Sequence, residues 1–318
     1  MTVQLFAPEL KTMNRPRHVF IGGLPRSGTT LIARILAQHP DVSAFSDTGV
    51  GQDEGQFLQS VYPTAISLGG PGRFAFDPAA HLTETSRLLS EENKSKLRRE
   101  WNKYWNLEKT VLVEKTPMNI LISRFLNQIF ADCYFIFMTR HPIAVSIATQ
   151  KWSRTSIFSL MNHWLVAHEI LAADIEFLPG CAVIPYERLV NDPEPILRGL
   201  EKALALGKLA YKFHLDSGVN DKYFKIWADV FHRRANRTLP GLGNLKDIQR
   251  ADIPQSGKAM PYLTSVARPG AQGGGQRPML LTDPLSESQD AIALFGERIE
   301  RLGYSLEDLT LCPDVIAK

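Results

Sequence analysis

The sequence predicts an α/β fold, a three-layer α/β/α arrangement in which helices cover both faces of a central parallel sheet. Short apolar runs have the length of buried strands, and the stretches between them have helical character. This alternation is typical of parallel strands joined by right-handed helical crossovers. The expected strands are "VFIGG" at 19–23, "TVLVEK" at 110–115, "YFIFMTR" at 134–140 and "AVIPYE" at 182–187.

The expected helices lie between these strands, at about 28–38, 117–130, 142–176 and 193–205. The first of them is the best defined, because its apolar residues line one face at helical spacing and Pro40 ends it. Those apolar residues are Leu31, Ile32, Ile35 and Leu36.

The rest of the chain is expected to elaborate one domain, 1–318, whose nucleotide-binding core covers about 18–205. Residues 43–80 have weak periodicity and many turn formers, which indicates a long excursion over the strand ends, where binding loops lie. Residues 81–105 are typical of an exposed, charged helix, and 233–280 of a Gly/Pro/Arg-rich loop. We expect an amphipathic helix at about 285–302.

Composition excludes several classes of protein. The net charge of +3 is small, the basic residues are dispersed and no aromatic platform motif occurs, so we expect no nucleic-acid partner. The sequence has no run of 18 apolar residues, so no transmembrane segment is expected, and its first residues lack the apolar core of a secretory signal. The cysteines, at 133, 181 and 312, are far apart and odd in number, which favours reduced thiols in a cytoplasmic protein.

The stretch "GGLPRSGTT" at 22–30 lies between the first strand and the first helix. Gly23 and Gly28 have the spacing of the phosphate loop G-x-x-x-x-G-K-[ST], in which backbone N–H groups and a helix N-terminus bind an anion. Thr29 replaces the lysine that contacts a nucleoside triphosphate, and the strand "YFIFM" leads into Thr139 and Arg140 instead of a metal-binding Asp. The loop therefore suits a phosphate-bearing group with less charge and no metal. The alternative is a glycine-rich turn with hydroxyl side chains that cap the helix.

The segment "LPRSGTTLIARILAQHPDV" resembles the 5′-phosphosulfate loop of sulfotransferases that use 3′-phosphoadenosine 5′-phosphosulfate (PAPS). Three further segments resemble blocks of that family in the family's order: "EKTP" at 114–117, "FMTRHPIAVSIATQKW" at 137–152 and "IPYERLVNDPEPIL" at 184–197. The resemblance implies a P-loop NTPase-like sulfotransferase fold. It also implies PAPS as donor, 3′-phosphoadenosine 5′-phosphate (PAP) as product, no metal, and an acceptor with a hydroxyl or amine.

The resemblance also assigns donor-binding residues. The 5′-phosphosulfate would be held by Pro25, Arg26, Ser27, Gly28, Thr29 and Thr30. Arg26 can donate two hydrogen bonds to phosphate or sulfate oxygens and stabilise charge on the bridging oxygen during transfer.

Arg140 is the family-like candidate for the 3′-phosphate, although a solvated charge at a strand end is the alternative. The family usually has a Ser eight residues later, where this chain has Ala148, so we expect Ser146 or Thr149 to replace it. Tyr186 matches a family tyrosine near the adenine, or else is a half-buried core aromatic. The basic cluster Arg233, Arg234 and Arg237 is a further candidate for the 3′-phosphate, although a solvated face is the better interpretation.

An acceptor hydroxyl needs a general base within hydrogen-bond reach. We expect Glu54 to be this base, with Asp47, which has the spacing of some eukaryotic members, as its rival and Asp53 as a third acid. Each acid alone could equally be a solvated side chain. Lys115 would hold the sulfate or Glu54, or else form a salt bridge in the neighbourhood of Glu114.

Two other functions are alternatives to the sulfotransferase. A P-loop kinase or NTPase needs a lysine at position 29 and a metal-binding Asp, and both are missing. A non-catalytic scaffold that binds PAPS or another nucleotide would keep the loop and lose the base. The acceptor stays open among carbohydrate, lipid, small metabolite and peptide tyrosine. Several aromatic residues are expected either to line an apolar acceptor pocket or to pack in the core: Phe57, Tyr62, Phe74, Phe76 and Trp152.

Overall fold

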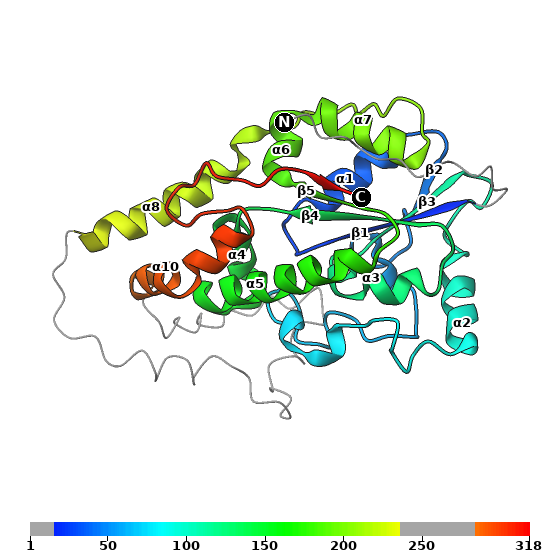
Figure 1. Ribbon diagram of the computed structural model, residues 1–318, viewed down its shortest axis with the longest axis horizontal. Helices are drawn as coiled ribbons and strands as arrows, with labels where there is room; N and C mark the ends of the chain where they lie inside the picture. The colour runs from blue at the N-terminus through cyan, green and yellow to red at the C-terminus, as the bar shows by residue number, and fades with distance from the viewer. Residues whose placement is uncertain (1–15, 236–283) are drawn as a thin grey trace, which may run out of the picture.

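A six-stranded sheet with the order β2-β3-β1-β4-β5-β6 forms the centre of the fold (Figure 1). The structure is a computed structural model that describes residues 16–235 and 284–318. The first five strands of this order pair in parallel, and β6 pairs with β5 in the antiparallel sense. The strands are β1 (Arg17–Gly23), β2 (Val42–Ala44), β3 (Val111–Lys115), β4 (Cys133–Thr139), β5 (Cys181–Pro185) and β6 (Ile316–Ala317).

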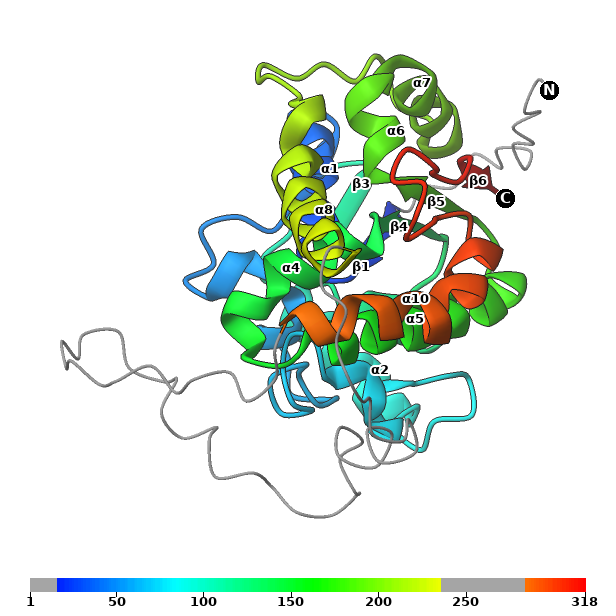
Figure 2. The ribbon, with the colours of Figure 1, turned by 90° about the vertical axis from the view of Figure 1, so that its left-hand side faces the viewer.

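Helices cover both faces of this sheet, which confirms the predicted three-layer arrangement (Figure 1). Alternation along β1 sends Val19 and Ile21 to one face and Phe20 to the other. The Val19 face packs on α1 (Thr29–Leu36), α6 (Tyr186–Asn191) and α7 (Pro193–Leu204). The Phe20 face packs on α2 (Glu91–Trp101), α3 (Asn119–Asn127), α5 (Ile157–Asp174) and α10 (Pro284–Arg301). α10, expected at about 285–302, contacts α5 along its length (Figure 2).

The register of the central strands brings their carboxyl ends to one edge. Ile21 of β1 is paired with Lys115 of β3, and Gly23 is paired with Met138 of β4. The glycine loop, Lys115 and Arg140 therefore leave the sheet side by side. In open α/β sheets this edge is where ligands bind.

Several boundaries differ from the prediction. The helix expected at 142–176 is two helices, α4 (Pro142–Ser153) and α5, because Arg154 adopts a left-handed conformation with φ of 52° and the Ser156 side chain caps α5. Of the helix expected at 81–105, only α2 forms, with Ser90 as its cap. The last expected strand ends at Pro185, and Tyr186 begins α6. β2, β6 and α8 (Asp221–Ala235) were not predicted.

The expected excursion at 43–80 begins in β2 and continues as short turns that pack on the Phe20 face of the sheet. Tyr62 and Phe74 are buried in this core, and the side chain of Trp101 in α2 donates a hydrogen bond to the carbonyl of Gly55. The excursion is thus largely held in place by its own apolar side chains. Most of the second expected loop, 233–280, lies outside the described residues.

Candidate active site

The glycine loop leaves β1 and enters α1 with backbone angles that two glycines allow. Gly23 and Gly28 have φ of 147° and 104°. A Cβ on Gly23 would lie 2.5 Å from the carbonyl oxygen of Met138, and one on Gly28 would lie 2.8 Å from the Tyr186 ring. Both positions therefore need the absence of a side chain.

Donor groups of this loop are left for a ligand. α1 begins at Thr29 with no side-chain cap, and within the described residues the backbone N–H groups of Thr29 and Thr30 have no hydrogen-bond partner, whereas that of Leu31 donates to the carbonyl of Gly28. Ser27 is fully buried, and among the residues that the structure describes its Oγ has no hydrogen-bond partner. An anion at this helix N-terminus would satisfy these donors, which is the property that phosphate loops use. The residues present therefore fit a phosphate or sulfate group.

Arg26 and Arg140 are joined through the loop backbone. Nη1 of Arg140 donates a hydrogen bond of 2.8 Å to the carbonyl oxygen of Arg26. The guanidinium of Arg26, on an exposed residue whose own φ is 75°, lies over the ring of Trp152 in α4, 4.6 Å from its centroid. Two guanidinium groups thus belong to one structural unit at the edge of the sheet.

Arg140 is buried, so the alternative of a solvated strand-end charge is wrong. Its Nε and Nη2 atoms donate to Oδ1 of Asn220, at 2.8 and 2.6 Å. Its guanidinium lies 4.2 Å from the centroid of the Tyr186 ring and 5.7 Å from that of Tyr223. Burial lowers the pKa of Arg140, but an arginine keeps its charge in proteins. The site therefore holds a fixed cation between two aromatic rings.

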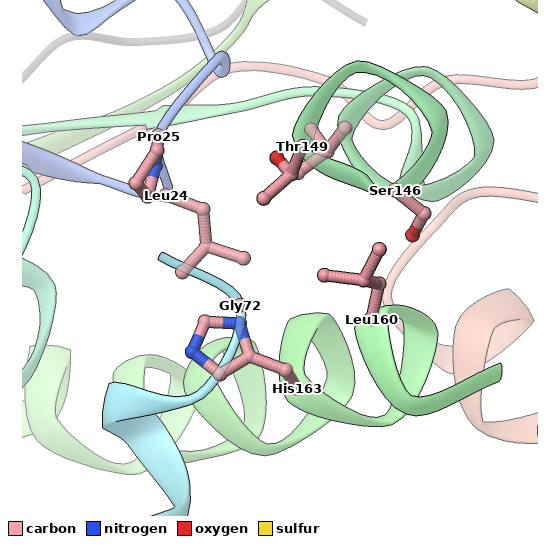
Figure 3. A pocket seen from close by; sticks show the side chains of 8 residues that line it. Leu24, Pro25, Gly72, Ser146, Thr149, Leu160 and His163 are labelled. Carbon is pink, nitrogen blue, oxygen red and sulfur yellow. The ribbon is translucent and has the colours of Figure 1, made fainter. Parts of the chain in front are cut away.

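The structure does not bring Ser146 and Thr149 to Arg140. Ala148 faces the Arg140 side of α4, where it packs with Tyr223. Ser146 and Thr149 instead line a pocket on the Pro25 side of the helix (Figure 3). Asn220 and Tyr223 take the place beside Arg140. The sequence contains no motif for either residue. Both lie beyond the end of α7, outside the family-like blocks, the last of which ends at residue 197. The side chains of Arg233, Arg234 and Arg237 lie outside the described residues.

The three candidate acids are in different environments. Glu54 pairs with Lys115, with 3.2 Å between Oε1 and Nζ, and its Oε2 accepts a hydrogen bond of 2.6 Å from Gln56. Asp53 accepts hydrogen bonds from the hydroxyl and the N–H of Thr48, and these bonds lower its pKa. Asp47 is exposed, with φ of 53°. Glu54 is thus the acid that is oriented by a cation at the carboxyl end of the strands.

Glu114 is a buried acid whose role was not predicted from the sequence, in which it is only the neighbour of Lys115. Its Oε1 accepts hydrogen bonds from the N–H of Gly55 at 2.9 Å and from the hydroxyl of Thr116 at 2.5 Å. Its Oε2 accepts one of 2.6 Å from Asn119. Burial raises the pKa of Glu114 to about 7, although these hydrogen bonds and the charge of Lys115 oppose the change. Glu114 therefore anchors Gly55, and with it the adjacent Glu54, to the sheet.

We expect Gly55→Ala to destabilise the fold by about 1–3 kcal/mol. The added Cβ would lie 2.6 Å from Oε1 of Glu114, so the carboxylate or the loop has to move. Gly51→Ala is the matched control in the same segment, since its Cβ would come no closer than 3.9 Å to Phe57. Urea unfolding of both variants measures the difference. Equal free energies of unfolding would show that the Glu114 anchor is not rigid.

Glu114 is also expected to make stability fall as pH rises from about 4.5 to about 7. In this window the folded state, with its raised pKa, keeps a proton that the unfolded chain, with a pKa near 4.5, has lost. The free energy of unfolding therefore decreases with pH, by about 3 kcal/mol for this group. Urea unfolding between pH 4 and 8 should show a slope in the wild type that is reduced in Glu114→Gln. The exposed Glu108→Gln should keep the wild-type slope, and an unchanged slope in Glu114→Gln would contradict this assignment.

The described residues contain neither a metal-binding cluster nor a membrane-spanning helix. In residues 16–235 and 284–318, no group of three or more His, Cys, Asp or Glu side chains is placed to hold a metal ion. Among the same residues, no helix is both long and apolar enough to cross a membrane.

The sheet and its glycine loop define an α/β protein with a P-loop-like fold. The chain belongs to the sulfotransferase family, because the model of that family matches residues 16–208.

Curated relatives agree with this family. The chain is 27% identical over 198 residues to a protein-tyrosine sulfotransferase of Drosophila melanogaster, which covers 58% of this chain and 37% of the relative. It is 26% identical over 206 residues to the nodulation protein NoeE of Sinorhizobium fredii, and the match covers 56% of this chain and 48% of NoeE. The chain thus spans about half or less of the length of these two relatives.

Solved structures give a further likeness. One is the sulfotransferase domain of the Synechococcus PCC 7002 olefin synthase, with a TM-score of 0.41, 17% identity, and 78% of this chain and 96% of that chain covered. Another is the sulfotransferase STF1 of Mycobacterium tuberculosis, with a TM-score of 0.40 and 12% identity. This match covers 67% of this chain and 72% of that chain.

Proposed function

We propose that this protein transfers a sulfuryl group from PAPS to a hydroxyl or amine of an acceptor such as a carbohydrate, lipid or small metabolite. The observation that carries the proposal is the unit formed by the glycine loop and Arg140, joined by the 2.8 Å hydrogen bond to the Arg26 carbonyl. PAPS bears anionic groups at both ends of its adenosine, and this unit offers a cation for each. Thr29 in place of a lysine suits a phosphosulfate better than a triphosphate.

Each residue of the unit has a role in this reaction. The loop 25–30 binds the 5′-phosphosulfate, and Arg26 stabilises the charge on the phosphate oxygen when its bond to sulfur breaks. Arg140 binds the 3′-phosphate, and Tyr186 contacts the adenine. As the acceptor oxygen forms its bond to sulfur, its proton goes to the carboxylate of Glu54, which Lys115 orients. Because the sulfuryl group has less negative charge than a phosphoryl group, the proposal includes no metal.

We also retain two predictions about context. One is a cytoplasmic location, which is supported by Cys133, Cys181 and Cys312, because all three are free thiols and suit a reducing compartment. The acceptor is expected to approach from the side of residues 43–80 and 233–280, and most of the second range lies outside the described residues.

Calorimetry with PAP and with ATP, each with and without magnesium, tests the donor. We expect PAP to bind tightly and independently of magnesium, and ATP to bind more weakly. A preference for magnesium-bound ATP would contradict the proposal and favour a kinase or NTPase. Tight PAP binding without transfer of labelled sulfate to components of a cell extract would favour a non-catalytic scaffold.

A further inference from the structure

The carboxylate of Glu54 has a second partner besides Lys115. Nε2 of Gln56 donates a hydrogen bond of 2.6 Å to Oε2 of Glu54, whereas Lys115 pairs with Oε1 at 3.2 Å. One carboxylate oxygen thus accepts from a neutral group and the other from a cation. An ionised carboxyl group has about four lone-pair sites, so sites remain for the proton of an acceptor.

The orientation of the Gln56 amide is fixed by its own contacts. Gln56 is 3% exposed, and its Oε1 accepts a hydrogen bond of 2.7 Å from the N–H of Ala65. In a flipped amide, the NH2 group would meet that N–H and the oxygen would meet the Glu54 carboxylate, so both contacts would be repulsive. Only the orientation in which Nε2 faces Glu54 satisfies both neighbours. The hydrogen bond to Glu54 is therefore determined by the fold of the excursion.

The backbone of Gln56 is tied to the strand that carries Lys115. Its N–H donates a hydrogen bond of 3.2 Å to Oγ1 of Thr116, a fully buried residue that directly follows Lys115. The amide and the ammonium group that hold Glu54 are thus both anchored at the carboxyl end of β3. The two oxygens of the carboxylate are held relative to one element of the sheet, which fixes the direction in which the carboxylate faces an acceptor.

A neutral hydrogen-bond donor suits this place because a cation is already present. Lys115 pairs with Glu54, and its charge lowers the pKa of two further acids, Asp53 and Glu114, although it is a lesser cause in both. A second cation beside Glu54 would favour the charged carboxylate further and weaken it as a base. An amide supplies a directional hydrogen bond without a charge. Gln56 can therefore orient the carboxylate with a smaller loss of basicity.

We propose that Gln56 is a positioning residue of the transfer reaction, which holds the carboxylate of Glu54 in the orientation that accepts the proton of the acceptor. The proposal rests on the sulfotransferase function above and on Glu54 as its base. Gln56 acts through Oε2 of Glu54 and needs no contact with either substrate. Its effect on activity is therefore expected only in a protein that has the Glu54 carboxylate.

Gln56→Glu tests this role with a side chain of nearly the same size. The new carboxylate can still accept from the N–H of Ala65, but its second oxygen replaces the donor that faces Glu54. Two carboxylates this close share one proton and release it at a higher pH than a single carboxylate does. We expect the acidic limb of the pH profile of kcat/KM for PAPS, with a cell extract as acceptor source, to move up by about one pH unit or more. In a Glu54→Gln background, the same change should lower kcat no further.

Gln59→Glu is the matched control in the same excursion. Nε2 of Gln59 donates hydrogen bonds to the carbonyls of Gln56 and Tyr62, at 3.2 and 2.8 Å, and neither bond involves Glu54. A carboxylate there faces carbonyl oxygens, so we expect a lower free energy of unfolding and an acidic limb in its wild-type position. An acidic limb that moves equally in both variants, or in neither, would overturn the proposal. A further loss of kcat in the Glu54→Gln background would do the same.

Gln56→Met provides a second test that adds no charge. Calorimetry with PAP shows whether each variant folds, and Gln56→Met decides the matter if Gln56→Glu does not bind PAP. Loss of one hydrogen bond to a charged group should lower kcat about tenfold and leave KM for PAPS within about twofold of the wild type. Wild-type kcat in Gln56→Met would reject the role of Gln56.

Failure of the proposed function has a different signature. If the wild type transfers no sulfate from labelled PAPS, the sulfotransferase function is rejected, and the role of Gln56 with it. If the wild type is active and Glu54→Gln is equally active, the function stands, whereas Glu54 is not the base and Gln56 does not position one. An active wild type, an impaired Glu54→Gln and an unaltered Gln56→Glu would reject the present proposal alone.

Discussion

Arg26→Ala is expected to lower kcat for sulfuryl transfer by about 10²–10³-fold, the loss found when one preorganised donor to a developing oxyanion is removed. The guanidinium can donate two hydrogen bonds to the phosphosulfate, and no other described side chain of the loop carries a charge. Arg26 has φ of 75°. Alanine, like arginine, carries a Cβ, so the backbone strain at this position is nearly the same in both proteins. The loss therefore reports the guanidinium and not the shape of the loop.

Labelled PAPS and a cell extract as acceptor source measure this loss, and calorimetry with PAP measures binding separately. Arg34→Ala is the matched control, because Arg34 lies on helix α1, which follows the glycine loop, and its guanidinium lies 5.3 Å from the centroid of the Phe213 ring. Its kcat should stay within about twofold of the wild type, as for a surface change away from the site. Retention of full activity by Arg26→Ala would remove Arg26 from the catalytic machinery.

The parts of the fold that could be predicted are those encoded by a few consecutive residues. Strand β1 followed from one apolar run, and the glycine loop followed from two glycines whose positive φ values the structure needs. The break between α4 and α5 was missed for the converse reason. Apolar spacing continues through 142–176, but one residue, Arg154, adopts a left-handed conformation, and Ser156 caps a new helix there. A Ser that precedes a second apolar run was the available signal.

The candidate site was harder to predict, because its partners come from distant segments. From the sequence, Arg140 was expected to be a phosphate ligand or else a solvated charge at a strand end, but Asn220, which precedes α8, and Tyr223 of α8 lie beside it. Glu114 looked like a partner of Lys115. Successive side chains of a strand point to opposite faces, so Glu114 instead meets Gly55, Thr116 and Asn119. No spacing rule relates these residues, since the contacts depend on how the excursion folds back on the sheet.

The folding of the excursion onto the sheet brings Glu54 to Lys115, and the two form an ion pair. The Lys115 ammonium is nearly buried, and besides Glu54 it donates a 3.0 Å hydrogen bond to the carbonyl of Gln52. A buried cation of this kind needs a nearby negative charge. Glu54, whose own side chain is only 12% exposed, supplies it. The pair is therefore both a tether for the excursion and a way to fix one carboxylate oxygen near the glycine loop.

Glu54→Gln is expected to lower kcat by about 10²–10⁴-fold, the range for loss of a general base. Glutamine has the size of glutamate, and its amide oxygen can still accept a hydrogen bond from Lys115, so the tether is kept while the proton acceptor is removed. Asp47→Asn is the rival test. Because Asp47 is exposed and its side chain makes no hydrogen bond or ion pair with another described residue, we expect this variant to stay within about twofold of the wild type, as for a surface change.

Activity over a range of pH separates a chemical from a structural role for Glu54. A lost base flattens the acidic limb of the pH profile of kcat/KM, whereas a loosened tether lowers activity at every pH and also lowers the free energy of unfolding. Full activity of Glu54→Gln together with an inactive Asp47→Asn would transfer the role of base to Asp47. In that case the 3.2 Å ion pair would be a structural tether, and Lys115 would hold the sulfate.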